Sequence, residues 1–216
     1  MLFFKRNICV LVLSVFCCCG LAFADVFNHP VNKKSKPELE KALAKVMNYE
    51  VASGDFKQTK SIKKNNRKFV STGTFMISKK NGIIWKTQKP IFSELALNNG
   101  GIFERDSSGQ SHMLLPKDNP IFADLSKNIQ SFFSGKISEL ETKFQVFYEK
   151  KACGFIMGLV PQEAMVRMVI DNVVIEACKN IDKVTITDGE KNPVMLEFLN
   201  YKIIGKATPN RTSSVP

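Results

Sequence analysis

The sequence contains none of the short motifs that mark the common enzyme sites. A Gly-x-Ser-x-Gly elbow, a His-Glu-x-x-His pair, a phosphate-binding glycine loop and a neighbouring Cys-His pair are all absent, and these arrangements place a nucleophile, a catalytic metal or a nucleotide. Asp182, Asp188 and Glu190 stand in turn-like or alternating contexts, and we interpret them, with His112, as surface groups. We therefore predict a protein that is not an enzyme and needs no cofactor. The alternative is an enzyme-like barrel that uses a cavity carboxylate or His112.

Long uncharged apolar runs are also scarce, and the one that exists lies at the N-terminus. Lys5 and Arg6 precede this run (residues 8–23), and Ala22-Phe23-Ala24 closes it with small residues where a signal peptidase reads them. The run is short for a spanning helix, which needs roughly 20 apolar residues. The residues before its cysteines lack the small-residue pattern of a lipoprotein signal. We predict a signal peptide over residues 1–24, cleaved after Ala24, and a soluble exported product.

Cysteine and histidine are too few to suggest a metal site. Four of the six cysteines lie in the signal peptide, so that Cys153 and Cys178 remain, far in sequence from His29 and His112. We therefore predict no metal. Two cysteines in an oxidising compartment suggest one structural disulfide. Two free thiols are the alternative.

Acidic residues are outnumbered, since 31 lysines and arginines face 20 aspartates and glutamates and the formal net charge is +11. Many of the cations gather in one segment: Lys57, Lys60, Lys63, Lys64, Arg67 and Lys68. Such a cluster is typical of a solvated hairpin loop, but it also suits anionic lipid headgroups. For an exported protein we expect anionic lipid rather than nucleic acid as the partner.

The periodicity of apolar residues predicts helix first and strands afterwards. Residues 25–36 are polar and basic, which indicates a flexible lead-in. An amphipathic helix is expected from Pro37 to about Val51, with Leu39, Leu43, Val46 and Met47 at three- and four-residue steps. From Phe69 to Ser78 large and small residues alternate, as in a strand with one buried face. A second helix is expected over residues 121–133.

Further alternating segments complete the predicted fold. They lie at 83–87, 92–97, 102–105, 144–149, 155–160, 168–177, 184–187 and 195–201. We predict a mainly β (α+β) fold, a curled antiparallel half-barrel covered by helical lid segments, because two amphipathic helices must cover one apolar sheet face. This single domain spans residues 37–206, and the Ser/Thr/Pro-rich residues 207–216 form a disordered tail.

Several segments, taken in order, resemble the LolA-type outer-membrane lipoprotein carriers. In that family a Phe-x-Gln sequence begins the first strand, a glycine lies at the centre of the second, a basic turn leads into a strand that ends in tryptophan, and a proline follows. The corresponding segments here are 54–60, 73–77, 79–85 and Pro90. Residues 161–175, 184–189 and 196–200 resemble the C-terminal strands of one branch of the family.

The resemblance implies a monomeric periplasmic carrier whose apolar cavity holds the acyl chains of a lipoprotein, or another lipid, between the inner and outer membranes. Its implied partners are an inner-membrane release machinery and an outer-membrane acceptor. Lys79 stands where the best-known members have a functionally important arginine, and Lys80 stands where they usually have proline. The alternative is a basic membrane-surface or lipid-binding module that serves another envelope export pathway.

The candidate lipid-binding residues are the apolar ones expected on the lid helices and on the sheet face beneath them. From the helices we select Leu43, Met47, Leu125, Ile129 and Phe132, and from the strands Phe75, Ile77, Trp85, Leu95 and Leu97. Each of these residues is also a plausible ordinary core residue. Seven methionines follow residue 24 and would suit a soft, adaptable lining.

Overall fold

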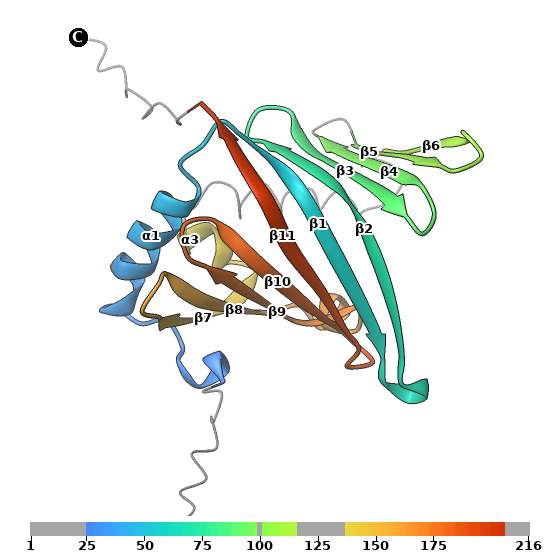
Figure 1. Ribbon diagram of the computed structural model, residues 1–216. Helices are drawn as coiled ribbons and strands as arrows, with labels where there is room; N and C mark the ends of the chain where they lie inside the picture. Colours follow the sequence, from blue (N-terminus) through green and yellow to red (C-terminus); the bar gives the residue numbers. More distant parts are fainter. Residues whose placement is uncertain (1–24, 99–100, 116–136, 206–216) are drawn as a thin grey trace, which may run out of the picture.

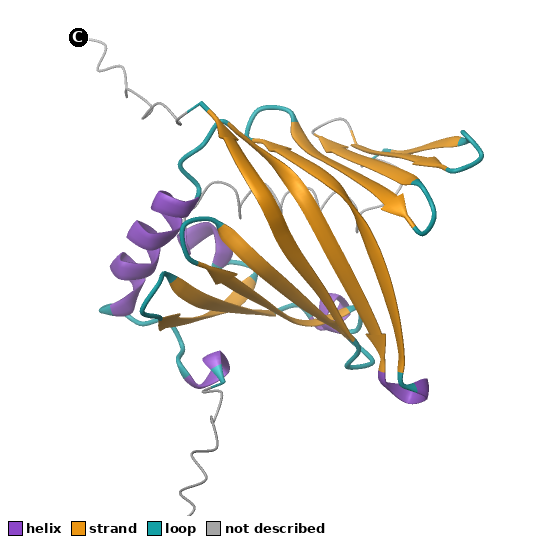
Figure 2. Cartoon of the chain, viewed as in Figure 1, coloured by secondary structure: helices purple, strands orange, loops and turns teal. Residues whose placement is uncertain are grey.

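The computed structural model describes residues 25–98, 101–115 and 137–205 (Figures 1 and 2). These residues form one antiparallel sheet of 11 strands in the order β6-β5-β4-β3-β2-β1-β11-β10-β9-β8-β7. The sheet curves, and because β6 and β7 end the order it is not closed into a barrel. The predicted mainly β, antiparallel, curled fold is confirmed.

The N-terminal half of the sheet is a meander in which each strand pairs with the next. Its strands are β1 (Val51–Ile62), β2 (Arg67–Ser78), β3 (Gly82–Lys89), β4 (Ser93–Asn98), β5 (Gly101–Asp106) and β6 (Ser111–Leu114). A short 3-10 helix, η2 (Lys63–Asn65), forms the β1–β2 turn. The sequence did not predict β6, since four residues are too few to display an alternating pattern.

The C-terminal half is a second meander. Its strands are β7 (Phe144–Lys150), β8 (Phe155–Pro161), β9 (Ile170–Ala177), β10 (Ile181–Asp188) and β11 (Pro193–Ile204). The short helix α4 (Ala164–Arg167) lies between β8 and β9. The two meanders join where β1 pairs with β11, from Val51 opposite Ile204 to Lys60 opposite Val194.

The first long helix is shorter than predicted. Helix α1 spans Ser35–Val46 and therefore ends well before Val51. The reason is strand pairing. Val51 lies opposite Ser78 on β2 and Ile204 on β11, so that it forms part of the sheet and does not continue the helix. The predicted second helix, with Leu125, Ile129 and Phe132, lies outside the described residues, as do the predicted signal peptide and the predicted tail.

The segment predicted as a flexible lead-in contains defined structure, and this corrects the sequence interpretation. A 3-10 helix, η1, spans Val26–Asn28. The Tyr148 N–H donates to the His29 carbonyl oxygen, and the Val31 N–H donates to that of Val146, each at 2.9 Å. The segment follows β7 because the strand is a sheet edge with free hydrogen-bonding groups, which polar composition alone does not reveal.

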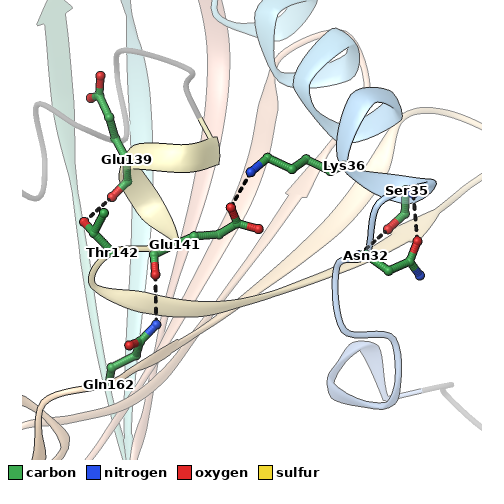
Figure 3. Close-up of polar contacts among 7 residues, drawn as sticks. All are labelled: Asn32, Ser35, Lys36, Glu139, Glu141, Thr142 and Gln162. Atoms are coloured by element: carbon green, nitrogen blue, oxygen red, sulfur yellow. Dashed lines mark hydrogen bonds and ion pairs between the residues drawn. The ribbon is translucent and has the colours of Figure 1, made fainter.

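Polar contacts fix the start of α1 (Figure 3). The Asn32 side chain accepts hydrogen bonds from the N–H groups of Lys34 and Ser35, and the Ser35 hydroxyl accepts one from the Asn32 N–H at 3.0 Å. Lys36 forms an ion pair with Glu141, which directly follows the short helix α3 (Ile137–Leu140). The Gln162 side chain donates to the Glu141 carbonyl oxygen at 2.9 Å. These contacts hold α1 against the C-terminal half of the sheet.

The hydrophobic core lies between α1, α3 and the sheet. Leu39 and Leu43 of α1 are fully buried, together with Ile137 of α3 and with Phe155 and Met157 of β8. Burial of this face of α1 explains why a helix of twelve residues is stable here, since isolated helices of that length are marginal in water.

Cys153 and Cys178 form a disulfide, as the sequence predicts. Their Cα atoms are 5.1 Å apart. Cys153 precedes β8 and Cys178 follows β9, and these strands pair from Phe155 opposite Ala177 onward. The bridge therefore closes the end of this hairpin.

Candidate functional site

The face of the sheet that packs against α1, here called the inner face, is the candidate site. The register places Phe56 of β1 opposite Gly73 of β2 and Phe198 of β11, and it places Phe75 of β2 opposite Trp85 of β3. Since successive residues of a strand point to opposite faces, these side chains share one face. Neighbouring strands thus bring together residues that are far apart in sequence.

Four aromatic side chains, Phe56, Phe75, Trp85 and Phe198, form what we call the aromatic cluster. The rings of Phe56 and Trp85 are stacked with their centroids 3.9 Å apart, and the edge of one ring meets the face of the other between Phe75 and Phe198 at 5.0 Å. Phe56 and Phe75 are buried, whereas Trp85 and Phe198 are only half-buried. The cluster therefore reaches from the core to a partly open surface.

Two glycines make room for the aromatic cluster. A Cβ atom on Gly54 would come within 2.9 Å of the Phe75 ring, and one on Gly73 within 2.9 Å of the Phe56 ring and 1.8 Å of the Lys86 carbonyl oxygen. Each phenylalanine therefore lies over the glycine opposite it on the neighbouring strand. This is the physical reason for the glycine at the centre of the second strand that the sequence comparison singled out.

Beyond the cluster, the inner face of β9, β10 and β11 carries only apolar side chains over a stretch that we call the apolar strip. Its members are half-buried: Val173, Val184, Ile186, Val194 and Leu196. On the opposite face of the same strands lie mainly polar residues, including the ion pair between Lys183 and Glu176. The strip adjoins Phe198 and forms an amphipathic sheet surface of the kind that binds apolar ligands.

Four of the predicted cavity residues lie in one packed cluster. Leu43 and Met47 of the first helical segment and Phe75 and Ile77 of β2 are all buried there. The structure thus brings the predicted helix and strand residues together. They have little accessible surface, and contact with a lipid stays a prediction for each of them.

The remaining predicted strand residues differ in exposure. Trp85 is half-buried at the margin of the core, Leu97 is buried, and Leu95 is 37% exposed. Leu95 lies opposite Trp85 and Leu97 lies opposite Ile83, so that both leucines occupy the inner face. A role for them in lining a cavity stays a prediction.

Sequence reasoning missed Phe56, Phe198 and the apolar strip as site residues. The alternation of Val184 and Ile186 with threonines was a usable signal for β10. No such signal predicted the position of Phe198 beside Phe56, because this position depends on the pairing of β1 with β11. Among the seven methionines of the described residues only Met47 and Met157 are buried, and these two belong to the core. A methionine-rich lining stays a prediction.

Lys79 lies in the β2–β3 turn, over the ring of Tyr49. The ammonium nitrogen of Lys79 is 5.7 Å from the centroid of the ring. The backbone N–H of Lys79 donates a hydrogen bond to the Glu50 carbonyl oxygen at 3.1 Å. Partial burial lowers the pKa of Lys79, and burial raises the pKa of Tyr49. The basic residue of the predicted turn therefore connects this turn to the loop between α1 and β1.

An open depression of about 750 Å³ lies near the β1–β11 bulge. Its lining includes Asp55, Met76, Lys86 and Asn200, and the Asn200 amide donates to the Asp55 carboxylate at 2.6 Å. Because charged and apolar groups mix in this lining, it does not offer the continuous apolar surface of the apolar strip.

The described part of the chain offers no group of three or more His, Cys, Asp or Glu residues placed to hold a metal ion. Within the same residues, no helix has both the length and the apolar composition needed to cross a membrane.

Comparisons with known proteins identify a family. The sequence pattern of the family described as outer membrane lipoprotein carrier protein LolA matches residues 47–211. No curated protein sequence matches.

Solved structures with similar coordinates include a LolA superfamily protein from Nitrosomonas europaea, with 7% identity, a TM-score of 0.45 and coverage of 79% of this chain and 93% of that chain. A DUF1329 family protein from Desulfovibrio piger shows 8% identity, a TM-score of 0.41 and coverage of 79% and 92%. The MucA/MucB complex of Pseudomonas aeruginosa shows 9% identity and a TM-score of 0.45, and the match covers 78% of this chain and 56% of that one.

Proposed function

We propose a function for this chain, which belongs to the LolA family of outer membrane lipoprotein carrier proteins: it is a periplasmic carrier that shields the acyl chains of a lipoprotein or another lipid. Members of this family are carrier and binding proteins. In the proposed role the protein takes its cargo from an inner-membrane release machinery and gives it to an outer-membrane acceptor, without catalysis.

The observation that supports this proposal most directly is the apolar strip beside the aromatic cluster. Val173, Val184 and Phe198 pack against the core on one side and keep accessible surface on the other. An acyl chain gains roughly 0.8 kcal/mol for each buried methylene. Because these side chains already have accessible apolar surface, an acyl chain can bind to them without any opening of the core.

The first test identifies the cargo. The protein is purified from the cell envelope without detergent, extracted with organic solvent and analysed by mass spectrometry. We expect fatty-acyl material in stoichiometric amount. Protein that carries no acyl material, and that takes up no fluorescent acyl ligand afterwards, would contradict the proposal.

A second test uses two neighbouring valines on opposite faces of β9. Val173 lies opposite Ile186 on the inner face, and Val174 lies opposite Thr185 on the outer face. Both side chains are half-buried. We expect Val173→Asn to weaken the binding of a fluorescent acyl ligand about tenfold, because a buried amide costs about 1–3 kcal/mol when its hydrogen bonds are not replaced. Val174→Asn is the matched control.

Binding must be measured on folded protein, so the melting temperature of each variant is recorded. Equal ligand affinity in the two variants would show that the apolar strip is not part of the binding site. Equal loss of melting temperature with a selective loss of binding in Val173→Asn would support it.

A further inference from the structure

Three connections meet at the end of the sheet that lies away from α1 (Figure 1). The Asn192 side chain, in the β10–β11 turn, accepts a hydrogen bond from the Lys63 N–H in the β1–β2 turn at 3.0 Å. In the same β10–β11 turn, the Gly189 N–H donates to the Val169 carbonyl oxygen of the α4–β9 connection at 3.1 Å. The two turns and this connection are therefore one continuous surface, which we call the turn end.

The turn end exposes large apolar side chains. In the α4–β9 region Met165 is 69% exposed, Met168 71% and Val169 63%, and on the β1–β2 hairpin Phe69 is 52% and Val70 49% exposed. The hairpin protrudes because β2 pairs with β3 only from Thr72 onward. Met165 lies on α4, Met168 and Val169 lie in the connection that follows it, and Phe69 and Val70 lie on the β2 strand of the hairpin. Because these exposed side chains are carried by two separate connections at the end of the sheet, they suit insertion into a soft surface better than the binding of a helix or a peptide.

The hairpin that carries Phe69 and Val70 is rich in cations. Lys63, Lys64, Arg67 and Lys68 lie in and beside the β1–β2 turn and are all exposed. No aspartate or glutamate occurs between Asp55 and Glu94, and this hairpin therefore has no acidic residue of its own. The neighbouring turn contributes Asp188 and Glu190, which reduce the positive charge of the turn end and leave it concentrated on the hairpin.

Exposed apolar side chains next to basic ones are the combination that binds the interface of an anionic bilayer. The apolar groups enter the boundary between headgroups and acyl chains, and each nearby Lys or Arg is attracted to the negative surface potential. A nucleic acid would use the cations but would leave Met165, Met168 and Val169 in water. We propose that the turn end docks the protein reversibly on anionic membrane surfaces, with Met165, Met168 and Val169 inserted and the β1–β2 hairpin on the headgroups.

This docking does not depend on the acyl site of the inner face. It places the protein on a bilayer with α1 and the core directed away from the lipid. The two proposals can therefore fail separately: Val173→Asn should not change binding to vesicles, and the turn-end variants should not change the affinity for a soluble fluorescent acyl ligand.

The experiment measures co-sedimentation with two kinds of sucrose-loaded vesicles. One kind is phosphatidylcholine alone, and the other contains about 30% of the anionic lipid phosphatidylglycerol. We expect binding to the anionic vesicles at low salt. The triple variant Lys63→Gln, Lys64→Gln and Arg67→Gln should lower the affinity by about a hundredfold, since each cation near the surface contributes about fivefold. The control neutralises three exposed lysines at α1, Lys34, Lys41 and Lys45, and should bind like the wild type.

Insertion is tested separately from attraction. A tryptophan is introduced at Met168 in one variant and at Met76, an exposed methionine outside the turn end, in another. We expect brominated anionic vesicles to quench the emission of the Met168→Trp variant and to leave the added tryptophan of Met76→Trp unquenched.

Three results would overturn the proposal. They are equal binding by the turn-end triple variant and its α1 control, absence of quenching at position 168, and binding to DNA oligonucleotides without binding to vesicles. Because Met165, Met168 and the three basic residues are exposed, these variants are expected to fold like the wild type, and thermal unfolding verifies this.

Discussion

The two ends of the long strands β1, β2 and β11 have different surroundings, although the same strands run from one end to the other. Near α1 the inner-face residues, such as Ala52 and Ile77, are buried beneath Leu43 and Met47. At the turn end, Phe69 and Val70 of the same β2 strand are about half exposed. The strands supply a common frame, and the helices determine which part of it becomes core.

This difference separates stability from surface function. Fully buried apolar side chains contribute most of the free energy of folding, whereas exposed ones contribute little. The turn end is therefore free to carry lysines, which a core does not tolerate, next to exposed apolar side chains. The following predictions test how sharp this division is.

The largest effect is expected for Leu43→Ala. Leu43 is completely buried, and removal of a buried leucine costs about 2–5 kcal/mol, since the transfer free energy is lost and a cavity remains. Met165→Ala at the turn end should change the free energy of unfolding by no more than about 0.5 kcal/mol. Urea denaturation of both variants measures the contrast, and similar losses in the two would show that the division does not exist.

An intermediate effect is expected for Asn192→Ala. Its side chain is buried, accepts from the Lys63 N–H and donates to the Asp188 carboxylate at 3.2 Å, so that it joins two turns. Loss of these bonds should cost about 1–2 kcal/mol. The exposed turn residue Asn81 provides the control as Asn81→Ala. If Asn192→Ala is as stable as this control, the turn end is not held together as described.

The smallest effect concerns Asp188 and depends on pH. Hydrogen bonds from Asn192, chiefly its backbone N–H, lower the pKa of Asp188 below its ordinary value of 3.8. The carboxylate therefore contributes stability above that ordinary value and loses it as the pH falls through the lowered pKa. We expect Asp188→Asn to be slightly less stable than the wild type at neutral pH and equally stable in acid. Thermal unfolding across this range measures the difference, and a difference that persists in acid would contradict the explanation.

Local patterns in the sequence predicted most of the strands correctly. Alternation from Phe69 to Ser78 reflects a real difference between faces, because Phe75 and Ile77 are buried and Met76 is exposed. The same reasoning extended α1 too far, since Tyr49 and Val51 fit a helical repeat as well as a strand. Pairing with two neighbouring strands decides the state of Val51, and a one-dimensional pattern does not contain that information.

The candidate site was predictable only in part, for a related reason. Phe75 and Trp85 come from adjacent strands of a hairpin-linked meander, and their proximity follows from the Asn-Gly turn between them. Phe56 and Phe198 lie opposite each other because β1 pairs with β11, and no local pattern in the sequence predicts this pairing. The half of the site that depends on neighbours in sequence was found, and the half that depends on distant pairing was not.

The pairing of the first long strand with the last one has a consequence for how the chain is assembled. Each meander contains only contacts between near neighbours in sequence, which form quickly, whereas closing β1 against β11 brings together the most distant strands and is expected to come late. Until then the sheet edges at β1 and β11 are open to pairing with other chains, and the rings of Phe75 and Trp85 lack their contacts with Phe198. Pairing of the twelve-residue strand β11 with β1 is thus the completion step of the fold. A polypeptide released before β11 is synthesised is left with two separate half-sheets, whose edges at β1 and β10 are unpaired.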